Sequence, residues 1–147
     1  MENTIALSPE FTIAGQITPE QLKTAKQEGY QAVINLRVPG EQGFLDDEET
    51  QAKNAGLDYV NIPVSPSSLS EVTPEVIQHL ETLPKPVLVH CGSALRAGVM
   101  VLAYRGTREG KSTEELFDEA RKAGFAAFDS KPPMKQFIED YIANHRS

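Results

Sequence analysis

The sequence predicts a single α/β domain with a central, mostly parallel sheet flanked by helices. Short apolar runs rich in β-branched residues alternate with segments that carry helix-capping signals, in the order β-α-β-α-β-α-β. The 147 residues contain 39% hydrophobic residues and no repeat or linker. One hydrophobic core can form in a chain of this length, so we expect one domain over residues 1–147.

The predicted strands are the apolar runs Phe11–Ala14, Gln31–Leu36, Tyr59–Ile62 and Pro86–His90. Three helices are expected between them. The first begins at the N-cap Thr18, with Pro19 at its first position and Gln21 as the capping-box partner, and ends at Gly29. The others run from about Asp46 to Ala55 and from Thr73 to near Pro84. Ligands of such a sheet bind outside the carboxyl ends of its strands, where Arg37 and Cys91 follow.

The rest of the chain is expected to be helical. One helix is predicted from Ala97 to about Arg105, and a second begins at the capping box of Ser112 and Glu115 and ends at Gly124. A last helix should follow Pro132-Pro133. Apolar residues at helical spacing in these segments indicate core packing.

Charge and composition exclude several classes of function. A net charge of −7 argues against a general binder of nucleic acid or anionic membranes. A single cysteine allows no internal disulfide, no apolar run is long enough to span a bilayer, and no signal pattern begins the chain, so we expect a cytoplasmic protein. The acidic run Asp46–Glu49 is interpreted as a solvated first turn of a helix.

The segment from His90 to Gly98 carries the strongest functional pattern. Cys91 directly follows a buried-looking strand, and a helix is predicted to begin behind it. A loop in this place directs backbone N–H groups at an anion, and the same field favours a thiolate over a thiol. Arg96 suits bidentate recognition of an oxyanion, so Cys91 is a candidate nucleophile. The alternative is a small, buried and inert cysteine.

Two further observations concern the surroundings of this loop. Arg37 could line the same edge of the sheet, and a surface salt bridge is an equally good interpretation. The histidines His79, His90 and His145 lack ligand spacing with one another or with Cys91, so the sequence predicts no metal site and no cofactor.

These residues resemble the cysteine-dependent protein tyrosine and dual-specificity phosphatases, especially the bacterial branch also found fused to NAD kinase or metallo-β-lactamase-like domains. The resemblance is carried by Val33–Arg37, Tyr59–Val64 and the segment from Val87 through Arg96 and Gly98. It implies that Cys91 attacks phosphorus to form a phosphocysteine and that Arg96 clamps the oxyanion. It also implies backbone donors at Gly92, Ser93, Ala94, Leu95 and Ala97. His90 would orient the loop, or it is a satisfied core residue.

The chain departs from the usual pattern of these phosphatases in three places. Four residues separate Cys91 from Arg96 where five are usual, and Ala97 stands where Ser or Thr assists the leaving thiolate. The loop after the third strand, residues 65–68, has no Asp to act as the general acid. Glu71 or Asp46 could replace that acid if the fold brings either close.

The sequence therefore predicts a phosphomonoester hydrolase that acts on a phosphorylated protein or small molecule. Two alternatives remain open. The short loop resembles that of rhodanese-type sulfurtransferases, which would carry a persulfide on Cys91. A noncatalytic phosphate-binding module would need only the anion loop. Neither the substrate nor the oligomeric state follows from the sequence.

Overall fold

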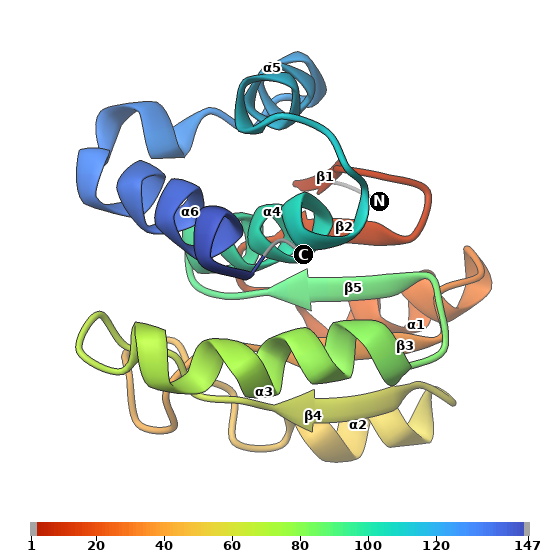
Figure 1. Cartoon of the computed structure of the whole chain (residues 1–147). Helices are drawn as coiled ribbons and strands as arrows, with labels where there is room; N and C mark the ends of the chain where they lie inside the picture. Colours follow the sequence, from red (N-terminus) through yellow and green to blue (C-terminus); the bar gives the residue numbers. More distant parts are fainter. Residues whose placement is uncertain (1–2, 146–147) are drawn as a thin grey trace.

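The fold is a mixed five-stranded sheet between two layers of helices (Figure 1). The computed structural model describes residues 3–145. The sheet order is β1-β2-β5-β3-β4, and every neighbouring pair is parallel except β1 and β2. The strands are β1 (Thr4–Ala6), β2 (Phe11–Ala14), β3 (Ala32–Asn35), β4 (Asp58–Asn61) and β5 (Val87–His90). The predicted α/β fold with a mostly parallel sheet is confirmed.

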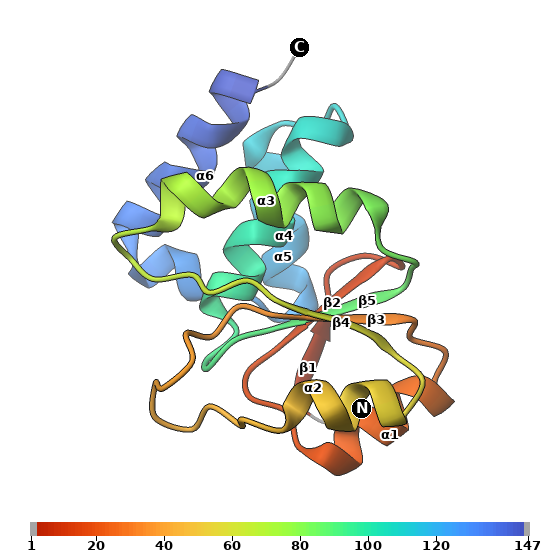
Figure 2. The same cartoon turned by 90° about the horizontal axis from the view of Figure 1, so that it is seen from below.

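The helices form one layer on each face of the sheet, as Figure 2 shows. One face is covered by α1 (Pro19–Gln27) and α2 (Glu48–Asn54). The other face carries α3 (Leu69–Thr82), α4 (Leu95–Arg108), α5 (Thr113–Ala123), the 3₁₀ turn η1 (Ala127–Ser130) and α6 (Pro132–His145). Because side chains alternate along a strand, Val33 and Leu88 join the core under α1 and α2, whereas Ile34 and Val89 join the opposite core.

Local capping signals predicted two helix starts correctly. The Thr18 side chain accepts a hydrogen bond from the Gln21 N–H, and the Gln21 side chain accepts one from the Thr18 N–H. Ser112 and Glu115 form the same reciprocal pair at the start of α5. These capping boxes satisfy backbone donors that the first turn of a helix leaves without partners.

Other boundaries differ from the prediction. α3 begins at Leu69, four residues before the expected N-cap Thr73, because Leu69 is buried and the first turn packs on the core. Thr73 lies inside the helix, where its hydroxyl donates to the Leu69 carbonyl at 2.5 Å. α4 begins at Leu95, two residues earlier than predicted. β1 and η1 were not expected.

The carboxyl ends of the four parallel strands lie along one edge of the sheet. Ala14 pairs with His90, His90 with Asn35, and Asn35 with Asn61. The segments that leave these strand ends are therefore neighbours, and they include the loop that begins at Cys91. No helix within residues 3–145 is long and apolar enough to cross a membrane.

Candidate active site

The loop from Cys91 to Ala94 connects β5 to α4, and backbone contacts hold it on both sides. The Cys91 N–H donates to the Ala14 carbonyl at 3.1 Å, and Ser93 forms an isolated antiparallel bridge with Gly15. A Cβ at position 15 would lie 2.9 Å from the Gly92 carbonyl oxygen, so a glycine there permits the close approach of β2 to the loop. Ala94 has a left-handed φ of 74°.

The first turn of α4 supplies the donors that an anion would use. The Gly98 N–H bonds to the Ala94 carbonyl, which is the first hydrogen bond of the helix. The N–H groups before it, on Leu95, Arg96 and Ala97, belong to the first turn, which has no carbonyl acceptors within the helix. The positive end of the helix dipole therefore lies at this loop.

Cys91 and Arg96 interact at the base of the loop. Cys91 is fully buried, with a relative exposure of 0%. Hydrogen bonds to Glu41 raise the pKa of Arg96 most, burial opposes them, and the interaction with the Cys91 side chain adds to the rise. Arg96 Nη1 donates to the Val64 carbonyl at 3.0 Å. The sulfur and the guanidinium that the sequence singled out are brought together.

Glu41 holds Arg96 through the two terminal nitrogens of its guanidinium. Arg96 Nη2 donates to Glu41 Oε1 at 2.9 Å, and Nη1 donates to Oε2 at 3.2 Å. Hydrogen bonds from Arg96, and then from Arg37, lower the pKa of Glu41 to about 2, although partial burial opposes the shift. The hydrogen bonds that Arg96 makes to oxygen within residues 3–145 use Nη1 and Nη2, and its side chain also interacts with Cys91.

Arg37 is a second guanidinium against the loop. It is buried, donates from Nη1 to Gln16 Oε1 at 2.6 Å, and donates from Nε to Glu41 Oε1 at 2.7 Å. A Cβ built on Gly92 would lie 3.4 Å from Arg96 Nη2 and 3.7 Å from Arg37 Nη2. The salt bridge expected for Arg37 is present, with Glu41, but it is not on the surface, because the Arg37 side chain is 8% exposed and lies against the loop.

His90 and Glu48 form a buried pair directly before the nucleophile candidate. His90 Nε2 and Glu48 Oε2 are 2.5 Å apart, with side-chain exposures of 0% and 1%. Glu48 also accepts from Gln16 Nε2 at 2.8 Å and from the Tyr59 hydroxyl at 2.9 Å. Burial alone would raise the pKa of Glu48, but these hydrogen bonds, led by that of His90, lower it. His90 Nδ1 is buried and has no partner among residues 3–145.

The position of Glu48 corrects the expectation of a solvated acidic turn. Asp46, Asp47 and Glu49 are exposed, as predicted, but Glu48 points inward at the first residue of α2. Glu48 lies four residues before the buried Ala52, and this spacing places both on the inner face of the helix. That spacing could have identified the buried carboxylate. Glu41 stands four residues after Arg37, a weaker indication in an irregular segment.

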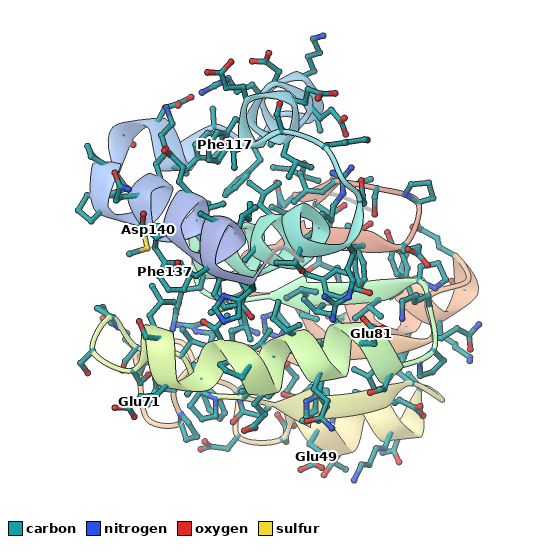
Figure 3. The ribbon with its side chains drawn as sticks, in the orientation of Figure 1. Glu49, Glu71, Glu81, Phe117, Phe137 and Asp140 are labelled. Carbon is teal, nitrogen blue, oxygen red and sulfur yellow. The ribbon has the colours of Figure 1, made fainter. Side chains whose placement is uncertain are left out.

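A cavity of about 450 Å³ opens beside the loop. Arg96, Glu41 and Ser93 contribute to its wall, together with Ser65 from the loop that follows β4. Neither Asp46 nor Glu71 lines this cavity, and Figure 3 shows Glu71 at the N-terminal end of α3. Among residues 3–145, no group of three His, Cys, Asp or Glu side chains could hold a metal ion.

The family follows from a match over most of the chain. Residues 4–106 match the family model described as "Beta-lactamase hydrolase-like protein, phosphatase-like domain". The chain belongs to this family. The matched region contains all five strands, Glu41, Glu48, the loop and Arg96. This phosphatase-like domain is therefore the unit that carries the candidate site.

Relatives and solved structures extend the comparison. A Beta-lactamase hydrolase-like protein of Xylella fastidiosa (strain Temecula1) is 32% identical over 126 residues, which are 83% of this chain and 28% of that protein. This chain thus spans less than a third of the length of the curated relative. PTPMT1 in complex with PI(5)P has a TM-score of 0.76 at 17% identity, covering 97% of this chain and 96% of the PTPMT1 chain. The catalytic core of the PP-IP phosphatase SIW14 from S. cerevisiae, in complex with citrate, has a TM-score of 0.72 at 19% identity and covers 94% and 84%. At these identities the two structures share the fold of this phosphatase-like domain.

Proposed function

We propose that this phosphatase-like domain hydrolyses phosphomonoesters through a covalent intermediate on Cys91. The observation that carries the proposal is the convergence of two guanidinium groups on Gly92, at a helix N-terminus and beside the single thiol. Three sources of positive potential meet where a phosphoryl group would bind. The chain has no second cysteine that could share this role.

The proposed reaction has two steps. The Cys91 thiolate attacks phosphorus, the bond from phosphorus to the ester oxygen breaks, and the ester oxygen leaves with the bonding electrons and takes a proton from water. Water then attacks the phosphocysteine, which releases inorganic phosphate and restores the thiolate. Arg96 and the N–H groups of residues 92–95 and 97 stabilise the equatorial oxygens, while Glu41 and Arg37 keep Arg96 in place.

Proton donation to the leaving group is the weak part of this site. Glu41 lines the cavity, but with a pKa of about 2 only about one molecule in 10⁵ carries the proton at pH 7. A missing general acid costs roughly a hundred-fold to ten thousand-fold in rate. We therefore expect activity on aryl phosphates, whose leaving groups need little protonation, and slow turnover of alkyl phosphates.

The test is phosphate release from p-nitrophenyl phosphate by the wild-type protein, Cys91→Ser and Arg96→Ala. The proposal requires release that both substitutions abolish. Circular dichroism and melting temperature serve as controls that each variant is folded. Release that persists in folded Cys91→Ser would rule out the cysteine mechanism, and no release from the wild type would rule out hydrolysis of this ester.

A sulfurtransferase is the second candidate, favoured by the four-residue spacing from Cys91 to Arg96 and by the low pKa of Glu41. This chemistry needs no general acid. The thiolate would attack the outer sulfur of thiosulfate, breaking the S–S bond to release sulfite and leave a persulfide on Cys91. Cyanide would then remove that sulfur as thiocyanate and restore the thiolate.

Both candidates can be compared in one series of incubations. Thiosulfate plus cyanide replaces the aryl phosphate, and thiocyanate formation that is lost in Cys91→Ser favours sulfur transfer. Intact mass after each incubation shows whether Cys91 carries a phosphoryl group or a sulfur atom. Phosphate binding that survives Cys91→Ser, with neither product formed, would instead indicate a noncatalytic binding module.

A further inference from the structure

The cavity beside the anion loop has walls that are mostly apolar. Val38 comes from the segment after β3, Val64 from the segment after β4, and Leu69 from the first turn of α3. Met134, on α6, also lines the cavity. Leu95, the first residue of α4, also lines the cavity. Five separate parts of the chain therefore place apolar side chains around one space that ends at the anion loop.

Arg96 connects this cavity to the phosphoryl site. Its side chain lines the cavity, interacts with Cys91, and lies against Gly92. A phosphomonoester bound to the loop would thus direct its esterified group into the cavity. A volume of about 450 Å³ is within the range of pockets that hold small organic ligands.

Charge in the cavity argues against a polyanionic or sugar-like group. Arg96 and Glu41 pair with each other, and Lys131, between η1 and α6, is the other cation that lines the space. A sugar or a second phosphate placed there would lose water without gaining enough hydrogen-bonding partners. An alkyl or aromatic group gains free energy from the same transfer.

We propose that the substrates of this domain are amphipathic phosphomonoesters whose apolar alcohol or phenol part occupies this cavity. The inference rests on the proposed function for the identity of the bound headgroup. Beyond the proposed function, it states that the leaving alcohol or phenol is apolar, and it identifies Met134 as a specificity-determining residue.

The test measures binding without turnover, so that it does not depend on hydrolysis. Methyl-, butyl- and octylphosphonate share one headgroup and differ only in chain length, and calorimetry gives their dissociation constants for the wild-type protein. Transfer of one methylene from water is worth roughly a fourfold change in affinity. We expect octylphosphonate to bind at least about tenfold tighter than methylphosphonate. Equal affinities would overturn the inference.

Variants distinguish the cavity from nonspecific adsorption. Met134→Gln keeps the local charge and removes apolar surface, so it should reduce the preference for octylphosphonate about threefold or more and leave methylphosphonate binding unchanged. Ala143→Gln, an exposed position on the same helix, is the matched control. Arg96→Ala should abolish binding of both phosphonates. Octylphosphonate that binds equally well to Arg96→Ala would also overturn the inference.

The outcomes separate this inference from the proposed function. Chain-length-dependent binding without phosphate release would leave the cavity assignment intact and remove hydrolysis. Phosphate release without chain-length dependence would do the reverse. As a kinetic check, 4-butylphenyl phosphate should exceed phenyl phosphate in kcat/KM, because the two phenols leave with similar ease.

Discussion

Replacing Glu48 by Gln should destabilise the protein strongly at neutral pH. The Glu48 carboxylate is 1% exposed and accepts hydrogen bonds from His90, Tyr59 and Gln16. A glutamine presents an NH₂ group in place of one carboxylate oxygen: on one side it faces the Gln16 NH₂ group as a second donor, and on the other it removes the charged acceptor that His90 and Tyr59 share. Gln16 cannot turn its amide to compensate, because its oxygen accepts from Arg37 and its nitrogen donates to the Ile17 carbonyl.

The expected loss follows from the groups involved. A hydrogen bond to a charged group contributes about 1.5–3 kcal/mol, and removing one partner of a buried ion pair costs about 3–5 kcal/mol. We expect Glu48→Gln to lower the free energy of unfolding by about 3–4 kcal/mol at pH 7. In a domain of this size that corresponds to a fall of roughly 10 °C in melting temperature.

The stabilisation that Glu48 contributes should decrease as the pH falls. Because the folded-state pKa of Glu48 is lowered below 4.5, its contribution is fully present above that pH and is lost as the pH falls further. The difference in melting temperature between the wild type and Glu48→Gln should therefore be largest near neutral pH and shrink below about pH 4.5.

Thermal unfolding followed by circular dichroism from pH 3 to pH 8 measures both effects. Glu49→Gln is the matched control, because Glu49 is the next residue of α2 and pairs with Lys53 at 2.9 Å in solvent (Figure 3). The control should lose less than about 0.5 kcal/mol. A loss below about 1 kcal/mol for Glu48→Gln at pH 7 would refute the reasoning, because the negative charge of Glu48 would then contribute little to its buried contact with His90.

Three further substitutions test the loop and its supports. Glu41→Gln should reduce the fall in melting temperature that the wild type shows between about pH 4.5 and pH 2. The Glu41 carboxylate stabilises the fold fully above about pH 4.5 and loses this effect as it is protonated towards pH 2, and melting temperatures measured against pH test this. Ala94→Gly should raise the free energy of unfolding in urea by about 0.5–1 kcal/mol, since φ is 74° there, and no gain would argue against this backbone. Gly98→Ala should cost about 1–3 kcal/mol in the same assay, because its Cβ would lie 2.2 Å from Phe125 Cζ; a stabilised variant would contradict this packing.

The elements that sequence predicted well are those set by local rules. The capping boxes at Thr18 and Ser112 involve residues three positions apart, and the buried strands read as continuous apolar runs. The prediction of helix boundaries was weaker where contacts between residues far apart in the sequence decide where a helix begins. The Thr73-Pro74 pair has the form of an N-cap, yet α3 continues through it because Leu69 is buried against the core.

The same distinction applies to the site. Cys91 and Arg96 lie five residues apart, one in the loop and the other in the first turn of α4, so their spacing alone identified them. Glu48 lies 42 residues from His90, and Glu41 lies 55 residues from Arg96. These pairs form only because parallel strands β3 and β5 bring their carboxyl ends together. The four-residue spacing from Glu48 to Ala52 marks which carboxylate of the acidic run faces inward, but it does not show that His90 is the partner.

Charge balance explains why one carboxylate is placed between two arginines. Arg37 and Arg96 contribute two positive charges and Glu41 one negative charge, so the cluster carries a net charge of about +1. A thiolate at the fully buried Cys91 would be costly without a counter-charge, and this cluster supplies one. Two unpaired guanidinium groups beside Gly92 would repel each other and lose their orientation. Glu41 therefore fixes both guanidinium groups in place and still leaves the cluster one positive charge to face the Cys91 side chain.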